Sequence, residues 1–203
     1  MTQLTRRAAV LSAICSLGGC SAISSLNAAS EPLDTYDLRP VTGPKSGRRT
    51  TRTLLVAKPQ ASAPLTSDRI LVKPDAVSIT YLPDARWSDE LPDLVQSVLV
   101  QSISGTGRLG YVGRSDAGPI PDKAMLVRID AFEVAALQDG TFEARVVMDL
   151  TIINDSDQRV VGSRQFYQTR AVSSDTPQQI VIVFQEILND LLPDISDWSI
   201  RLV

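Results

Sequence analysis

Residues 142–153 alternate apolar and polar side chains along almost their whole length. One face of this segment carries Phe142, Ala144, Val146, Met148, Leu150 and Ile152. A period of two residues is typical of a strand that buries one face. The neighbouring segments 125–137 and 159–171 join it through turn-forming residues at 139–140 and 154–157. We therefore expect a three-stranded antiparallel meander.

Two other segments repeat with the period of a helix. Apolar residues recur at helical spacing across 91–103 and again across 180–192, where Thr176-Pro177 supplies a cap and a first-turn proline. We expect the second helix to end at Pro193. Short apolar runs at 54–57, 69–72, 77–81 and 109–112 add brief strands. The sequence predicts one α/β domain of mixed α+β type over residues 54–203, with a mixed, mostly antiparallel sheet packed by two main helices.

The first twenty residues have the layout of an export signal. Two arginines at 6–7 precede an apolar run at 8–17, which as a helix is about 15 Å long, half of a bilayer core of about 30 Å. Leu17-Gly18-Gly19-Cys20 resembles the lipobox of bacterial lipoproteins. We expect a signal peptide over 1–19, lipidation of Cys20 and a flexible tether over 20–53. The residues leave open the general secretory or the twin-arginine route.

Composition removes several function classes. The chain has a net charge of -3 and no basic stripe, so nucleic acid is not an expected partner. The chain has no histidine, which excludes Ser-His-Asp catalysis and His-bearing metal sites. Both of its cysteines precede residue 21. The carboxylates Asp93, Asp116, Asp130 and Asp149 show no spacing for acid–base work and are expected to be solvated. We expect no cofactor, no metal and no enzymatic activity.

Two short motifs are candidates for a partner interface. Arg86 and Trp87 have the composition of an interface hot spot, although a tryptophan buried at a helix–sheet junction explains the same pair. Asp68 and Arg69 have the composition of a recognition turn, although a capping aspartate beside a solvated arginine explains them equally well. Both interpretations of each motif stay open.

The order of several motifs resembles a known family. These motifs are 36–38 (Tyr-Asp-Leu) soon after the lipobox, 65–70 entering a strand, Tyr81, and 86–88 (Arg-Trp-Ser) before the first helix. Together they resemble the auxiliary lipoproteins of ABC-type transport systems, the paraquat-inducible lipoprotein group. The resemblance implies a non-enzymatic partner of an MCE-domain protein with its permease and ATPase. It also makes a homo-oligomer an expectation, because some members assemble as rings.

The same resemblance bears on location and on the C-terminus. Ser21 stands where an aspartate would retain the lipoprotein at the inner membrane, so the periplasmic face of the outer membrane is favoured. Family members often have a longer C-terminal helix, whereas here we expect Pro193 to interrupt it and Trp198 to lie in a short tail.

Three functions remain open. A transporter adaptor predicts a surface that buries against a partner. An independent carrier of lipid or another small ligand predicts an apolar cavity, which the aromatic content of 5% counts against. A cell-envelope enzyme predicts converging titratable groups, for which the candidates are few. We favour the adaptor.

Overall fold

The structure, a computed structural model, describes residues 33–116 and 118–203. The expected signal peptide and Cys20 lie outside these residues. The elements in chain order are β1 (Asp34–Tyr36), β2 (Thr53–Val56), β3 (Gln60–Ala61), the 3-10 turn η1 (Ala63–Leu65), β4 (Arg69–Lys73), β5 (Thr80–Trp87), α2 (Leu91–Ser104), β6 (Tyr111–Arg114), β7 (Lys123–Ala136), β8 (Phe142–Asn154), β9 (Val160–Val172) and α3 (Pro177–Leu202).

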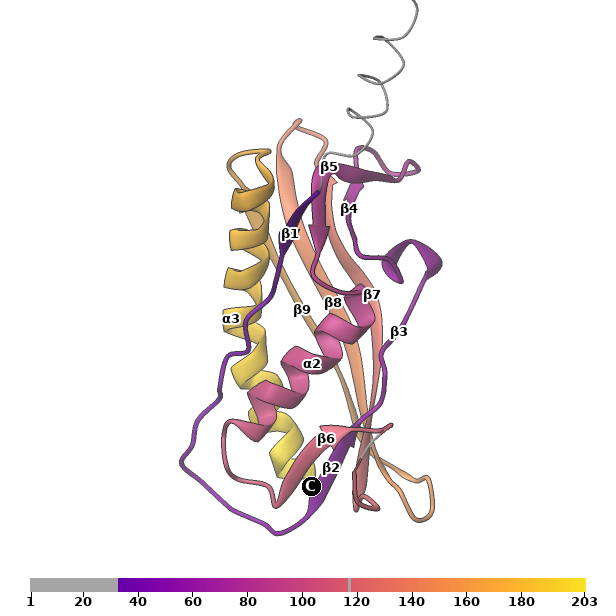
Figure 1. Ribbon diagram of the computed structural model, residues 1–203, viewed down its shortest axis with the longest axis vertical. Coiled ribbons are helices and arrows are strands. Elements are labelled where there is room, and N and C mark those ends of the chain that lie inside the picture. Colours follow the sequence, from indigo (N-terminus) through magenta and orange to yellow (C-terminus); the bar gives the residue numbers. More distant parts are fainter. Residues whose placement is uncertain (1–32, 117) are drawn as a thin grey trace, which may run out of the picture. The chain divides into compact units, whose positions relative to one another are not determined.

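The long strand β7 is the centre of the sheet (Figure 1). One of its edges pairs along the full length of β8, which pairs in turn with β9, and both pairings are antiparallel. The expected meander is therefore confirmed. The other edge of β7 pairs in parallel with three short strands in succession, first β2, then β3 and then β4. β5 then pairs with β4, β1 adds to β5 in parallel, and β6 adds to β2.

A bulge in β7 decides which of its residues enter the core. The pairing with β8 shifts register between Ile129 and Ala131. Up to this point odd-numbered residues such as Val127 are buried, and after it Phe132 and Val134 are buried. An extra residue in one strand reverses the alternation of faces. The bulge thus directs Phe132 into the core.

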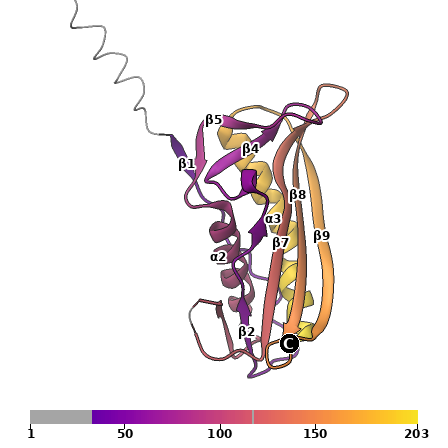
Figure 2. The same cartoon turned by 90° about the vertical axis from the view of Figure 1, so that its right-hand side faces the viewer.

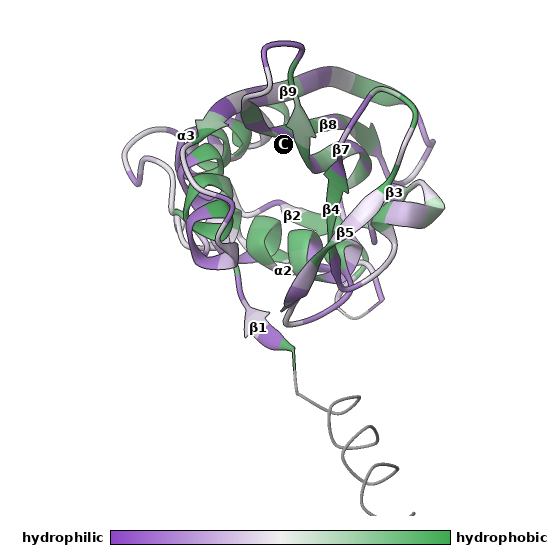
Figure 3. Cartoon of the chain, turned by 90° about the horizontal axis from the view of Figure 1, so that it is seen from above, coloured by the Kyte–Doolittle hydropathy of each residue, from purple (hydrophilic) through white to green (hydrophobic). Residues whose placement is uncertain are grey.

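The two helices of the described residues lie against the inner face of the sheet (Figure 2). Seen from above, the sheet curls so that β9 and β8 contact α3, while α2 contacts α3, β6 and β2 (Figure 3). The even-numbered residues of β8 from Ala144 to Ile152 are fully buried under these helices. The expected fold class, a mixed α/β domain with two helices, is confirmed.

The second helix continues through Pro193, so the expected stop at this residue is wrong. α3 runs from Pro177 to Leu202 and includes Trp198, whose ring meets the ring of Phe166 edge to face at 5.5 Å. A proline inside a helix costs about 3 kcal/mol relative to alanine. Burial of Ile195 and Ile200 beyond the proline offsets this cost.

The folded domain starts earlier than residue 54. The residues from 34 onward, expected to belong to a tether, pack on the body because they carry apolar anchors and find backbone partners there. Leu38 is only 3% exposed, and the Val41 N–H donates to Ser102 Oγ at 3.1 Å. The side chain of Arg108, a residue that follows α2 in the chain, donates to the Arg48 carbonyl at 3.2 Å. The described part of the domain therefore begins at Asp34.

The strand expected at 77–81 is also displaced. The structure places β5 at Thr80–Trp87, while Val77 and Ile79 lie in the preceding loop with exposed fractions of 92% and 51%. The side chain of Asp75 accepts the N–H groups of Val77 and Ser78 at 2.8 Å and 2.7 Å. These hydrogen bonds fix a turn where the apolar pattern alone favours a strand.

Candidate interface and apolar pocket

The sequence motifs at 67–69 and 86–88 meet at one corner of the sheet. Arg69 pairs with Arg86 across the antiparallel strands β4 and β5. The Trp87 N–H donates to the Asp68 carbonyl at 2.7 Å, and the Arg86 guanidinium lies 3.7 Å from the Asp68 carboxylate. The four candidate interface residues, Asp68, Arg69, Arg86 and Trp87, are thus close in space.

Strand β1 adds the 36–38 motif to the same corner. Tyr36 pairs with Trp87 in the parallel register of β1 and β5. The Tyr36 carbonyl accepts the Ser88 N–H at 2.7 Å, and the Asp37 carboxylate accepts the Ser88 hydroxyl at 2.9 Å. Segments that are about fifty positions apart in sequence therefore form one structural unit, which we call the β1–β5 corner (residues 34–38, 67–69 and 86–88).

Trp87 belongs to the core and not to the surface. It is 2% exposed, and its ring meets Phe132 and Phe184 edge to face at 5.8 Å and 5.7 Å. Phe132 and Phe184 stack on each other at 4.7 Å. This aromatic cluster joins β5, β7 and α3. Of the two interpretations of Trp87, the buried junction residue is the one that the structure shows.

The charged residues of the corner divide into two kinds. The side chains of Asp68 and Arg86 are 40% and 46% exposed and pair with each other on the surface. Arg69 turns away, donates to the Leu82 carbonyl at 3.1 Å and lies 5.9 Å from the centre of the Tyr81 ring. Asp68 and Arg86 therefore offer charge to a partner, as do the exposed Asp34 and Asp37 of the same corner.

The aspartates expected to be solvated are each paired with an arginine. Asp93, the most buried, accepts Lys58 at 2.6 Å and Arg114 at 2.8 Å. The hydrogen bond from Lys58 lowers the pKa of Asp93 below its usual value. Asp116 pairs with Arg114 as well, and Asp130 and Asp149 with Arg128. Asp116 and Asp130 pair with an arginine two positions earlier in the chain, whereas the partners of Asp93 and Asp149 come from other elements and could not be identified from the sequence.

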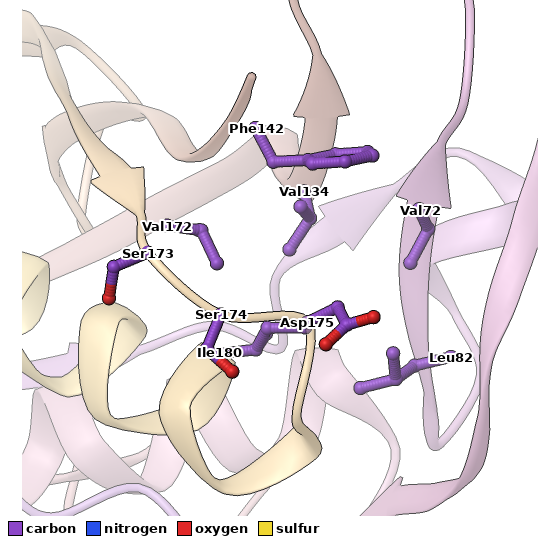
Figure 4. A pocket seen from close by; sticks show the side chains of 9 residues that line it. All are labelled: Val72, Leu82, Val134, Phe142, Val172, Ser173, Ser174, Asp175 and Ile180. Atoms are coloured by element: carbon purple, nitrogen blue, oxygen red, sulfur yellow. The ribbon is translucent and has the colours of Figure 1, made fainter. Parts of the chain in front are cut away.

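An open apolar pocket of about 530 Å³ lies at one end of the domain (Figure 4). Its walls come from the end of β4, the start of β5, the paired ends of β7 and β8, the end of β9 and the first turn of α3. The lining residues are Val72, Leu82, Val134, Phe142, Val172, Ser173, Ser174, Asp175 and Ile180. The low aromatic content counts against a large enclosed cavity, and this pocket is instead open to solvent at the end of the sheet.

No three histidine, cysteine, aspartate or glutamate side chains gather into a metal-binding group within residues 33–116 and 118–203. A helix long and apolar enough to cross a bilayer was likewise not found among the residues that the structure describes.

Comparison with solved structures supports the fold. A crystal structure of a Xanthomonas campestris protein of the DUF330 family is 25% identical, with a TM-score of 0.76, and covers 83% of this chain and 96% of that chain. A second solved structure, of an uncharacterized protein, is 16% identical with a TM-score of 0.65, covers 83% of this chain and 99% of that one, and shares the fold.

Comparison of sequences identifies the family. An uncharacterized protein of Bradyrhizobium diazoefficiens is 26% identical over 171 residues, which are 83% of this chain and 45% of that protein, so the chain spans less than half the length of this relative. The model of the ABC-type transport auxiliary lipoprotein component matches residues 36–196, a range that begins in the β1–β5 corner and ends in α3. The chain therefore belongs to the family of ABC-type transport auxiliary lipoprotein components.

Proposed function

We propose that this chain is the lipid-anchored auxiliary subunit of an ABC-type system that transports lipid. The observation that carries the proposal is the family match over residues 36–196. The lipobox-like sequence at Leu17–Cys20 agrees with it, because acyl chains on Cys20 would hold the domain at a membrane of the cell envelope. Ser21 favours the outer membrane, with the domain in the periplasm.

The proposed partners are an MCE-domain protein and, through it, a permease and an ATPase. In this role the chain acts as an adaptor that binds protein and catalyses nothing. The β1–β5 corner is the proposed contact surface, since the motifs that resemble the family converge there and present Asp68 and Arg86 to solvent. Charges at the rim of an interface steer and orient partners more than they add affinity. A homo-oligomer remains a prediction, for which native mass spectrometry of the detergent-extracted protein is the test.

Co-purification tests the proposal directly. The tagged full chain is extracted with mild detergent from its native envelope, and every bound protein is identified by mass spectrometry. We expect an MCE-domain protein with its permease and ATPase. Recovery of the chain without any transporter component would overturn the adaptor role, and recovery with phospholipid alone would favour an independent carrier.

Two substitutions locate the contact surface. Arg86→Glu is expected to reduce recovery of the partner about tenfold, because it reverses an exposed charge at the corner. Arg128→Glu is the matched control, since Arg128 is a similarly exposed, aspartate-paired arginine on β7. Equal recovery with both variants would remove the corner from the interface.

The anchor is tested with Cys20→Ala. The variant is expected to fold and to leave the membrane fraction, because the chain then lacks its acyl chains. A variant that still sediments with membranes after a salt wash would contradict lipidation at Cys20.

A further inference from the structure

The apolar pocket is lined by residues beside the turn between β7 and β8 and in the loop between β9 and α3, which lie at the same end of the domain (Figure 1, upper end). Phe142 lines the pocket and is 40% exposed, so the pocket presents a large apolar side chain to solvent. An apolar concavity of this kind marks a surface that meets an apolar partner. The pocket is therefore a candidate binding surface.

The walls of the pocket suit a hydrocarbon chain. Val72, Leu82 and Val134, with Phe142, Val172 and Ile180, offer no hydrogen-bonding side-chain group. The polar lining groups all come from the short segment 173–175 between β9 and α3. A ligand that fits this distribution has an apolar part in the pocket and a polar part at one edge. The volume lies within the range of about 300–1,000 Å³ that is usual for small-molecule sites.

The charge at the edge distinguishes between apolar ligands. Asp175 is the charged residue among those that line the pocket. A free fatty acid would bring a carboxylate towards the Asp175 carboxylate, and like charges repel. A phospholipid can keep its phosphate in the solvent and insert one acyl chain, so it avoids this repulsion.

The start of the described domain lies close in the chain fold to the pocket. Asp34 pairs with Ala85 on β5, and Ala85 follows the pocket residue Leu82 by three positions, which span at most about 10 Å. Leu33 lies thirteen positions after Cys20. A chain of this length reaches at most about 45 Å when it is fully extended. An anchor at Cys20 thus keeps the pocket near a bilayer that supplies phospholipid.

We propose that this pocket binds one acyl chain of a membrane phospholipid, so that the auxiliary subunit itself contacts lipid. The inference rests on the membrane anchoring that belongs to the proposed function. It goes beyond the adaptor role, which requires a protein-binding surface and no lipid site.

Photo-crosslinking in the native envelope tests the inference on the full chain. A benzophenone amino acid replaces Phe142 at the pocket or, as the matched control, Tyr167, an exposed aromatic residue on β9. After irradiation of living cells, adducts are identified by mass spectrometry. We expect phospholipid adducts at position 142 and none at the control position 167. Three results would each overturn the inference, namely equal lipid adducts at both positions, adducts at 142 with a partner protein, or adducts with the chain's own anchor.

A second pair of variants tests whether the pocket itself is needed. Val172→Trp fills the pocket, whereas Ala171→Trp places the same ring on the opposite face of β9. Val172→Trp is expected to lower the yield of lipid adduct at position 142 about tenfold, because filling the pocket is expected to weaken lipid binding by about that factor. Ala171→Trp is expected to leave it unchanged, and equal yields with both variants would count against the pocket.

Two further readouts keep the results interpretable. If thermal unfolding shows that Val172→Trp does not fold, the comparison of positions 142 and 167 decides alone. Co-purification of transporter components from the same cells is scored separately. Loss of lipid adducts with retained partners contradicts the pocket only, whereas loss of partners with retained lipid adducts contradicts the adaptor role only.

Discussion

Asp37 accepts a hydrogen bond from the Ser88 hydroxyl at 2.9 Å, although 51 positions separate the two residues. The same carboxylate oxygen accepts the Leu38 N–H at 2.9 Å. One side chain therefore joins the first described strand to the end of β5 and at the same time orders the backbone that leads to the buried Leu38.

Asp37→Ala is expected to lower the free energy of unfolding by about 1 kcal/mol, because both donors then depend on water. Ser88→Ala is expected to cost about 0.5–1.5 kcal/mol. Urea titrations of both single variants and of the double variant give the coupling between the residues. We expect a coupling of at least about 0.5 kcal/mol, and strict additivity would show that the hydrogen bond contributes nothing to stability.

Trp87→Ala is expected to destabilise the domain by about 3–5 kcal/mol, because it opens a cavity beside the stacked rings of Phe132 and Phe184. Arg86→Ala, one position away, is expected to change stability by less than about 1 kcal/mol, since its ion pair with Asp68 is exposed. Chemical denaturation at constant pH measures both. A Trp87 variant as stable as the Arg86 variant would contradict the core role of this tryptophan.

Asp197→Asn is expected to reduce stability at pH 7 by about 1–3 kcal/mol, because it removes the carboxylate that pairs at 2.9 Å with the buried Arg108. The hydrogen bond from Arg108 holds the pKa of Asp197 below its ordinary value of 3.8. The carboxylate therefore stabilises the fold above pH about 3.8, and this stability is lost as the pH falls through the lowered pKa.

The measurement is a series of denaturant titrations of wild type and Asp197→Asn from pH 7 down to pH 3. The difference between the two proteins is expected to be constant at neutral pH and to shrink at the acid end of the series. A difference that grew as the pH fell would show that the pKa of Asp197 is shifted in the opposite direction.

Pro193→Ala is expected to raise the free energy of unfolding by about 1–3 kcal/mol. Alanine restores the N–H that proline lacks within α3, and proline costs about 3 kcal/mol relative to alanine in a helix interior, partly offset by its stiffer unfolded chain. Thermal unfolding measures the shift. Asp194→Ala in the same turn is exposed and is expected to change stability by less than about 0.5 kcal/mol. A destabilised Pro193 variant would mean that the packing of this turn requires the proline ring.

The meander and both helices could be predicted from the sequence because their signals are local. The alternation in β8 and the helical spacing in α2 each reflect one element that buries one face. The family resemblance could also be read from the order of short motifs, and the match over 36–196 confirms it.

Tertiary packing decided the features that the sequence left open or misplaced. Burial of Ile195 and Ile200 carries α3 past Pro193, and the anchor Leu38 draws the segment after Asp34 onto the body. The pocket could not be predicted, because its lining residues come from separate elements that meet only when the sheet curls. The periodic pattern of a segment indicates which face of that one element is buried. Where a helix ends, where the domain begins and where a pocket opens depend instead on how all the elements pack together.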